Sequence, residues 1–512
     1  MYSQCQDKFY FAQKNFANKK NKYLQFKNDG YILLQIITEK IMVQNMTAGS
    51  PAKLILMFAL PLLIGNLFQQ LYQISDILIV GRLIGIEALA AVGATAPIYF
   101  VFLLIAFGFT GGLTVVTAQR FGAGDYKGVR TSITHSLIAA GILSGLITVF
   151  LILFLRPLLK IMNVPAEIME DAYKFMSVLT GGLILIVFFN LLSGFIRALG
   201  DSKTPLYFLV FSTLLNIAFN FTLIYHFKLG VVGSAIGSVC AIFISVILCL
   251  VYMYKKFPIM RLKAEDWKYS HAFMRVHLNI AVPMAIQFSV LSLSMMIIQS
   301  VCNSFGPDVI AAFTAALRIE QLATQPLVAL GIAMATYSAQ NWGAGKVTRI
   351  RKGVRIAGLT SLAISIFMSL AVRYIGRDMI SVFIKDGNQF IIDTGKFYLS
   401  ISTLFYFFLG MIFIFRNTLQ GMGKSLIPLI AGFTELGMRS FAAIYLAHVM
   451  GYKGIFYASP IAWFGASMVV MIGYVVTIYK LKGKKSKNYF KDNYHKIKLA
   501  ACINCVNQSS GE

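Results

Sequence analysis

Asp76 is the only acidic residue in the apolar run of residues 54–82, which is an unusual position for a charge. A carboxylate in the middle of a bilayer costs about 2.5–3.5 kcal/mol on insertion scales, and it persists only beside a partner or a watery cavity. Arg82 follows six positions later, so it does not share a helical face with Asp76 one turn along. Because desolvation favours the neutral acid, a carboxyl group here can take up and release a proton.

Amide and hydroxyl side chains provide further oxygen atoms within other apolar runs. Asn216 and Asn220 are spaced i, i+4 and therefore project from one face of a helix. Three more polar residues fall in neighbouring runs: Asn190, Ser234 and Ser238. Taken singly, each can be explained as a hydrogen bond between helices. Together with Asp76 they can form one cavity that binds a proton or a hard cation such as Na⁺, which prefers oxygen ligands.

Twelve apolar runs supply the elements that must position these residues. Of 512 residues, 57% are hydrophobic and 13% charged, and the mean hydropathy is +0.71. A helix needs roughly 20 residues to cross about 30 Å of hydrocarbon. We therefore expect an all-α polytopic membrane protein with twelve transmembrane helices. Their expected extents are 54–82, 88–112, 133–155, 175–197, 205–226, 231–254, 279–304, 309–333, 355–373, 397–419, 425–448 and 455–479.

An internal duplication divides these runs into two sets of six. Residues 118–124 read Ala-Gln-Arg-Phe-Gly-Ala-Gly, and residues 339–345, which lie 221 positions later, read Ala-Gln-Asn-Trp-Gly-Ala-Gly. An even number of spans per copy gives both halves the same orientation in the membrane, with a substrate path expected between them. Proline occurs in the first two runs of each half, at Pro61, Pro97, Pro283 and Pro326, and permits bending there.

We predict five segments from these patterns. They are an N-terminal cytoplasmic extension (1–52), a first six-helix lobe (53–254), a cytoplasmic linker (255–275), a second six-helix lobe (276–480) and a basic cytoplasmic tail (481–512). The extension lacks a signal peptide pattern. It is expected to be disordered or untranslated, with translation beginning at Met42 or Met46 rather than Met1.

Basic residues determine the expected orientation. With both termini cytoplasmic, that side collects 33 Lys and Arg against 10 on the other, a bias that favours this topology. The net charge of +26 does not indicate nucleic-acid binding, because the basic residues flank spans rather than form a domain. We expect them to meet anionic lipid headgroups at the cell membrane.

Cysteine and histidine provide little evidence for a metal or an enzyme. The six cysteines include one Cys-x-x-Cys pair, Cys502 and Cys505, which lacks the second pair of a zinc site. His135, His226 and His448 lie scattered at the ends of spans, and no nucleophile motif appears at bilayer depth. We expect no catalytic activity, no metal site and no cofactor.

The chain resembles the multidrug and toxic compound extrusion (MATE) family over about residues 46–480. The matching segments are Phe-Ala-Leu-Pro at 58–61, Gln-Gln-Leu-Tyr at 69–72, Asp76 with Val-Gly-Arg at 80–82, residues 119–124 and their twin, and residues 197–205. The resemblance implies a twelve-helix exporter with two six-helix lobes. It also implies export of organic cations in exchange for inward H⁺ or Na⁺.

The resemblance extends to individual residues of the expected ion site. Asp76 matches the acid of the family's first helix, Asn216 matches the Asn near it, and Ser238 stands where Thr is common. Asn220 departs from the pattern, because relatives with an ion site in this lobe often have Asp there. The seventh run (279–304) also lacks the acid found in some branches. Both departures reduce the charge available for Na⁺ and favour proton coupling at Asp76.

We therefore predict secondary active efflux of lipophilic organic cations by a monomer in the cell membrane. Ion coupling is assigned to Asp76, Asn190, Asn216, Asn220 and Ser238, and a substrate cavity to Gln69, Tyr72, Gln287, Arg318 and Glu320. The alternative is a lipid-linked oligosaccharide flippase of related fold. That function calls for many cavity Arg or Lys residues, and only Arg318, Arg416 and Arg439 lie within spans.

Overall fold

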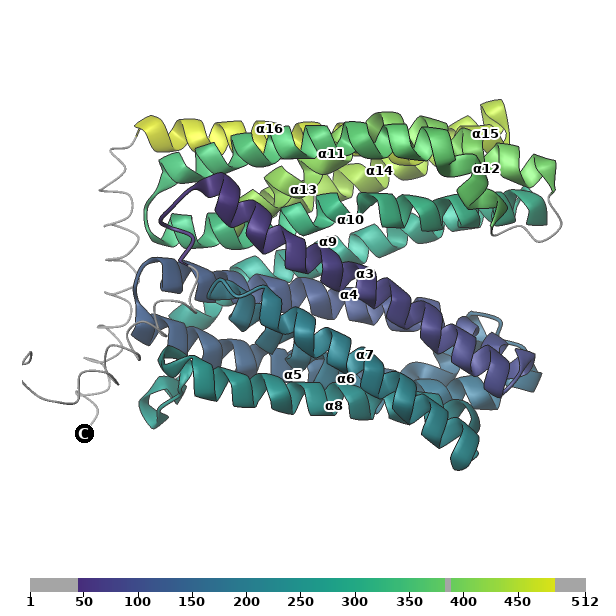
Figure 1. Ribbon diagram of the computed structural model, residues 1–512, viewed down its shortest axis with the longest axis horizontal. Helices are drawn as coiled ribbons and strands as arrows, with labels where there is room; N and C mark the ends of the chain where they lie inside the picture. Colours follow the sequence, from purple (N-terminus) through teal and green to yellow (C-terminus); the bar gives the residue numbers. More distant parts are fainter. Residues whose placement is uncertain (1–44, 383–387, 484–512) are drawn as a thin grey trace, which may run out of the picture. The chain divides into compact units, whose positions relative to one another are not determined.

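The described part of the chain holds twelve helical stretches that are long and apolar enough to cross a membrane (Figure 1). The computed structural model describes residues 45–382 and 388–483, and all regular structure within these ranges is helical. The predicted fold class, an all-α polytopic membrane protein, is confirmed. Some predictions fall outside the described residues or at their margins. They are the start codon, the N-terminal extension, the basic tail and the Cys502–Cys505 pair. The predicted segment limits stay predictions.

Six spans come from each half of the chain. In the first half they are α3 (Pro51–Leu83), α4 (Ile86–Gly122), α5 (Tyr126–Ile161), α6 (Ala166–Ala198), α7 (Lys203–Phe221) with the π turn η2 (Thr222–His226), and α8 (Gly230–Lys256). In the second half they are α9 (His271–Asn303), α10 (Pro307–Gly343), α11 (Val347–Ser381), α12 (Gln389–Ser402) with η5 (Thr403–Phe405) and α13 (Tyr406–Gly421), α14 (Leu426–Met450), and α15 (Tyr452–Ile455) with α16 (Ala458–Gly483).

Helices form because a segment in lipid must satisfy its backbone groups internally. Between them the chain turns at glycines with positive φ, which residues with a Cβ rarely adopt. The duplicated segments end α4 and α10 in this way, with Gly124 at φ 72° and Gly345 at φ 70°. Residues 118–124 and 339–345, called the paired turns below, therefore have equivalent backbone conformations in the two halves.

The paired turns also contact each other across the two halves. A Cβ on Gly122 would overlap the carbonyl group of Gln340, and a Cβ on Gly343 would overlap that of Gln119. The sequence showed that the two segments are equivalent but not that they pack together. Glycine is required here because each helix end lies directly against the backbone of the other.

The glutamines of the paired turns extend this reciprocal contact. Gln119 Nε2 donates to the carbonyl oxygen of Gly421 at 2.8 Å, and Gln340 Nε2 donates to that of Ala198, also at 2.8 Å. Gly421 ends α13 and Ala198 ends α6. Each glutamine thus caps a helix of the opposite half, where terminal carbonyl groups lack intrahelical donors.

Helices α4 and α9 continue the contact between the halves. A Cβ on Gly108 would lie 2.7 Å from the carbonyl oxygen of Met284, and one on Gly112 would lie 2.9 Å from the backbone nitrogen of Ala281. Small residues one turn apart allow two helices to approach this closely in a membrane. The contact between the halves involves α4 with α9 and α10, and α3 with α10. These are the same four helices that carry the prolines noted above.

Helix α3 belongs to both halves. In its first turns, Ile55 and Phe58 are fully buried in a core formed mostly by residues of the second half, such as Ile319. Just before the helix, Met46 N donates to Gln340 Oε1 at 2.8 Å. Further along, Gly65 faces α7 of the first half. The first span therefore crosses from one lobe to the other, with Pro61 close to the crossing.

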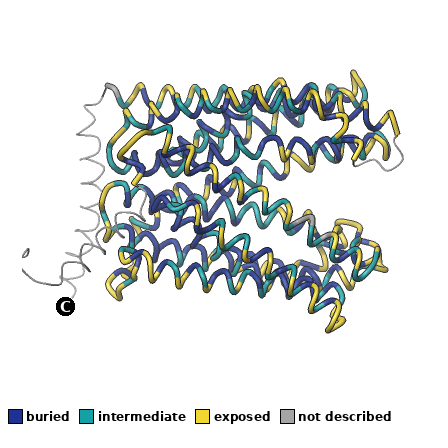
Figure 2. The backbone as a smooth tube through the Cα atoms, viewed as in Figure 1, coloured by how far each residue is buried: buried dark blue, intermediate teal, exposed yellow. Residues whose placement is uncertain are grey.

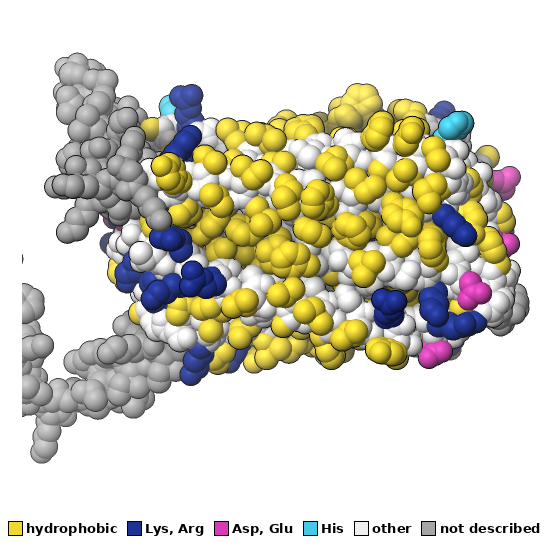
Figure 3. All heavy atoms as spheres, turned by 90° about the horizontal axis from the view of Figure 1, so that it is seen from above, with side chains coloured by type: hydrophobic (Ala, Val, Ile, Leu, Met, Phe, Trp, Pro, Cys, Tyr) yellow, Lys and Arg dark blue, Asp and Glu magenta, His cyan; other side chains and the backbone are white. Residues whose placement is uncertain are grey.

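The surface agrees with insertion in a membrane. One face shows a broad band of hydrophobic side chains, with Lys and Arg gathered toward its two ends (Figure 3). Along many helices, exposed and buried residues alternate as the helix turns (Figure 2). This alternation is typical of helices that pack on one side and meet lipid on the other.

The close approach of α4 and α9 gives a testable stability difference. Gly112→Ala places a methyl group into Ala281, and such overpacking typically costs about 1–3 kcal/mol. Thermal unfolding in detergent should show a lowered midpoint. The matched control is Gly141→Ala in α5, where a Cβ meets no atom within 4 Å and the change should be neutral or slightly stabilising. Equal midpoints for the two variants would contradict the tight contact.

Candidate functional site

The carboxyl group of Asp76 is the centre of a polar cluster in the first lobe. Its Oδ1 accepts a hydrogen bond from Asn220 Nδ2 at 2.7 Å and another from Ser234 Oγ at 3.2 Å. The three residues come from α3, α7 and α8. None of the ion pairs in the described part of the chain includes Asp76. The carboxylate is thus held by neutral donors, without a cation to balance its charge.

A second group of hydrogen bonds continues the cluster deeper along the same helices. Ser238 Oγ accepts from Asn216 Nδ2 at 2.9 Å and from Tyr72 OH at 3.2 Å. Asn220 Nδ2 lies 3.3 Å from Asn216 Oδ1 and connects the two groups. The predicted ion-coupling residues Asp76, Asn216, Asn220 and Ser238 therefore lie in one network, which Tyr72, assigned to the substrate cavity, also joins.

The spacing of residues on α7 and α8 produces this network. Asn216 and Asn220 stack on one face of α7, and Ser234 and Ser238 stack on the facing side of α8 at the same i, i+4 interval. Gly237 allows Asn220 to enter, because a Cβ on Gly237 would overlap Asn220 Oδ1. Ser234 was noted as polar but not assigned to the site, although its spacing from Ser238 repeats that of the two asparagines.

The amide oxygen of Asn220 lacks a hydrogen-bond donor in the described part of the chain. Asn216 and Asn220 are 1% and 0% exposed, and Asn220 Oδ1 has no hydrogen-bond partner among residues 45–382 and 388–483. A buried acceptor without a donor costs about 1–3 kcal/mol. A protonated carboxyl group carries one O–H donor, and a bound cation accepts oxygen ligands. Either species, placed within reach of this oxygen, would satisfy it.

Asn190 does not join this network. Its Nδ2 donates to the carbonyl oxygen of Ile186 on its own helix, at 2.9 Å. An amide that donates to a carbonyl oxygen of its own helix needs no partner on a neighbouring helix. The position of Asn190 in an apolar run was therefore a weak indication that it belongs to the shared site. Its ion-coupling role stays a prediction without a contact to support it.

The predicted cavity residues of the second lobe lie in different surroundings. Glu320 is 8% exposed and its Oε2 accepts from Tyr398 OH at 2.9 Å. Gln287 is 1% exposed and its Oε1 accepts from Gln420 Nε2 at 2.9 Å. Arg318 is exposed, while Gln69 in the first lobe is half-buried. Glu320 and Gln287 are thus engaged within their lobe, and the substrate cavity stays a prediction.

Glu435 and Arg439, spaced i, i+4 on α14, form an ion pair within one helix. Arg439 Nη2 donates to Glu435 Oε1 at 2.5 Å, and its Nη1 donates to Ser294 Oγ at 3.0 Å. The guanidinium therefore ties α14 to α9. Within the described ranges, no three His, Cys, Asp or Glu side chains are grouped as a metal site would require.

Comparisons with known proteins agree with the duplicated architecture. A family model described as MatE matches the chain twice, over residues 61–222 and 283–444. The probable multidrug resistance protein YoeA of Bacillus subtilis strain 168 is 26% identical over 454 residues, covering 87% of this chain and 97% of that protein. The probable multidrug resistance protein YpnP of the same strain is 27% identical over 418 residues, covering 80% and 92%.

A solved structure shares the fold over nearly its whole length. It is described as a MOP superfamily transporter from Pyrococcus furiosus, and it superposes with a TM-score of 0.81 at 25% sequence identity. The match covers 86% of this chain and 99% of that one. The twelve-helix arrangement is therefore the one found in solved transporters of this type.

The position of Gly237 gives a test of the cluster. Gly237→Ala forces Asn220 away from α8, which should break its 2.7 Å bond to Asp76. That bond stabilises the ionised carboxylate. Losing one hydrogen bond to a charged group corresponds to about 1.5–3 kcal/mol, so transport should fall at least tenfold. Gly181→Ala, where a Cβ meets nothing within 4 Å, is the control. Unchanged transport by Gly237→Ala would show that Asn220 is not needed.

Proposed function

The chain belongs to the MatE family of membrane transporters, and from this premise we propose that it exports lipophilic organic cations in exchange for inward protons. The family consists of transporters, and the two relatives named above are described as probable multidrug resistance proteins. We further propose that the protein lies in the cell membrane with both ends of the chain cytoplasmic, since basic residues favour that orientation. The coupling site is assigned to the network around Asp76.

The unbalanced charge of Asp76 is the observation that carries this proposal. Its carboxyl group is held by Asn220 and Ser234, and a carboxylate taken out of water without a cation beside it is costly. Uptake of a proton removes the charge and adds an O–H donor beside the amide of Asn220, whose Oδ1 has no partner in the described residues. One proton thus removes the unbalanced charge and gives this polar cluster a further donor.

Sodium fits the same site less well. Hard cations are usually bound by several oxygen ligands, and carboxylates supply most of the charge. Asp76 is the only acidic residue that the hydrogen bonds of this network include. The remaining oxygens are neutral amides and hydroxyls. This donor set favours a proton over Na⁺ as the coupling ion.

Helix α3 offers a route from the site to the contact between the lobes. Its second half carries Asp76, while its first turns pack in the core of the second lobe through Ile55 and Phe58. Protonation weakens the charge-assisted bonds from Asn220 and Ser234, so the second half of α3 can shift relative to α7 and α8. Pro61, which leaves a backbone bond of α3 unmade, permits the bend.

Coupling further requires that the ion and the substrate prefer different states of the protein. We assign the substrate cavity to Gln69, Tyr72, Gln287, Arg318 and Glu320. Counted together with Asp76 of the coupling site, Glu320 gives two carboxyl groups against the one guanidinium of Arg318. A cationic substrate is favoured while Asp76 is ionised, and its affinity falls when Asp76 takes up a proton. Because the proton and the cationic substrate favour opposite charge states of Asp76, the export of one is coupled to the uptake of the other, which is antiport.

Asp76→Asn tests the coupling directly. The amide keeps the size of the side chain but cannot exchange a proton, so export driven by a proton gradient should fall at least tenfold in proteoliposomes loaded with a fluorescent organic cation. Asp378→Asn changes an exposed acid on α11 in the same way and should leave export unchanged. Export by Asp76→Asn that still follows the proton gradient would exclude Asp76 as the coupling residue.

Asn220→Asp tests why the site prefers protons. The new carboxyl group takes the place of an amide whose nitrogen lies 2.7 Å from Asp76 Oδ1. Two neighbouring carboxyl groups supply the charge that Na⁺ binding needs. The apparent Na⁺ affinity measured by Na⁺-gradient transport should rise about tenfold, equivalent to ~1.4 kcal/mol. Asn417→Asp in the second lobe, where the amide donates to the carbonyl oxygen of Phe413 on its own helix, introduces the same charge outside the network and is the control. An equal response of both variants would argue against a site at Asp76.

A further inference from the structure

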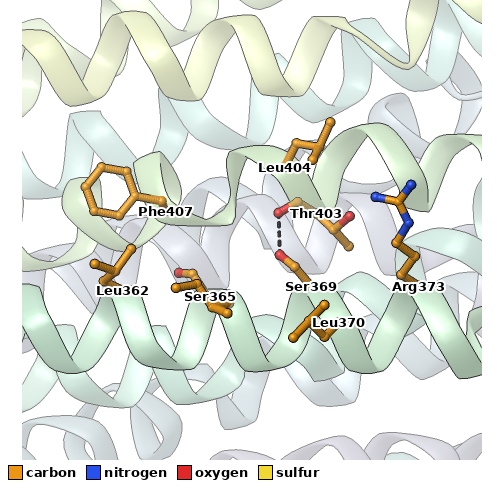
Figure 4. Close-up of a pocket in the computed structure, with 9 residues that line it drawn as sticks. Leu362, Ser365, Ser369, Leu370, Arg373, Thr403, Leu404 and Phe407 are labelled. Carbon is orange, nitrogen blue, oxygen red and sulfur yellow. Dashed lines mark hydrogen bonds between the residues drawn. The ribbon is translucent and has the colours of Figure 1, made fainter.

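Span 10 is broken in the middle without a proline. Helix α12 ends at Ser402, the short 3₁₀ turn η5 covers Thr403–Phe405, and α13 begins at Tyr406. Within this turn the carbonyl oxygen of Thr403 accepts a hydrogen bond from the backbone N–H of Tyr406. Ser369 on the neighbouring helix α11 adds a second donor, because its Oγ donates to the same oxygen at 2.6 Å (Figure 4).

A groove lies between α11 and this break. Its volume is about 260 Å³. Small hydroxyl residues, Ser365 and Ser369, line it on α11, one helical turn apart. Its apolar lining consists of Leu362, Ile366, Leu370, Leu404 and Phe407. Ile366 is 53% exposed and Leu404 is 66% exposed. Since these residues lie within membrane spans, the groove opens to lipid.

The protein leaves a polar atom unsatisfied in this groove. Ser365 is only 3% exposed, yet its Oγ has no hydrogen-bond partner in the described ranges 45–382 and 388–483. Figure 4 shows it in the row that leads from Phe407 toward Arg373. A buried hydroxyl without a partner indicates that protein groups alone do not complete this site.

Arg373 lies at one end of the groove, at the expected depth of the headgroups. The 35 residues of α11 span about 52 Å, so a hydrocarbon layer of about 30 Å centred on the helix leaves about 11 Å at each end. Arg373 is eight residues before Ser381, the last residue of α11, which corresponds to about 12 Å. Its guanidinium therefore reaches the boundary between hydrocarbon and headgroups.

The charge of Arg373 is available to a ligand. None of the ion pairs within residues 45–382 and 388–483 includes it, whereas Arg377, one turn further along, pairs with Asp393 at 3.6 Å. Guanidinium groups bind phosphate oxygens in a bidentate manner. An apolar groove that ends at an unneutralised guanidinium matches an amphiphile with an apolar chain and an anionic head.

We propose that this groove is a binding site for an anionic phospholipid of the leaflet at the C-terminal end of α11. One acyl chain lies between α11 and the break in span 10, and the phosphate contacts Arg373. A cationic substrate fits poorly, because Arg373 repels it. The groove is also smaller than the roughly 300–1,000 Å³ of pockets for drug-sized ligands. The bound chain packs against Leu404 of η5 and so braces the interrupted span.

Native mass spectrometry of the full chain tests this proposal. Protein reconstituted in nanodiscs of equal parts phosphatidylglycerol and phosphatidylcholine, then released, should retain one phosphatidylglycerol. Arg373→Gln should lower this retention about tenfold, as expected for the loss of one charge-assisted contact. Arg377→Gln is the matched control, since Arg377 already has a protein partner, and should retain the lipid.

A second variant tests the groove independently of the charge. Ile366→Trp enlarges an exposed side chain that faces the groove, so it fills the site without disturbing buried packing and should also abolish retention. Equal retention by the wild type and both variants would overturn the proposal. So would displacement of the lipid by a fluorescent organic cation, which would make the groove a substrate site. The readout is independent of transport, so failure here leaves the coupling proposal untouched.

Discussion

The direct contact between two glycine turns is the constraint on which the arrangement of the lobes depends. Gly122 lies against the backbone of Gln340, and Gly343 lies against that of Gln119. With no side chain between them, the two backbones fix the separation and angle of α4 and α10. The close approach of α4 to α9 at Gly112 follows the same geometry. Duplication thus gave the protein two equivalent helix ends, and the lobes meet through both.

The two lobes share this scaffold but differ in the chemistry that they enclose. The first lobe joins Asp76 to amides and hydroxyls without a cation. The second lobe neutralises one of its buried acids with Arg439 and gives Glu320 a tyrosine donor. A buried acid without a cation is costly to ionise, which applies to Asp76 and Glu320 but not to Glu435, because Arg439 pairs with it. Helix α3 connects the site around Asp76 to the opposite lobe. A change of charge in the first lobe can therefore act on the contact between two lobes of similar architecture.

Sequence predicted the features that depend on local pattern. Hydropathy identified twelve spans, the repeat identified two lobes, and the i, i+4 spacing of Asn216 and Asn220 predicted a shared face that meets Asp76. Contacts that depend on three-dimensional proximity could not be predicted this way. The repeat indicated equivalent turns but not their mutual packing, and Asn190 bonds to its own helix although its sequence context resembles that of Asn216. Gln287 was assigned to a cavity, yet a partner 133 positions away holds it, and no pattern in one sequence connects them.

The crossed glutamines have a consequence for how the lobes can move. Gln119 caps α13 and Gln340 caps α6, so each lobe holds the end of a helix in the other. Parting the lobes at this end exposes two helix termini together, because neither glutamine can keep its bond once the backbones separate. Losing one cap also removes the alignment that the second requires. We therefore expect the contact to open cooperatively, with two well-defined positions and few intermediates, so that the membrane is never bridged by a half-open path through which ions could leak.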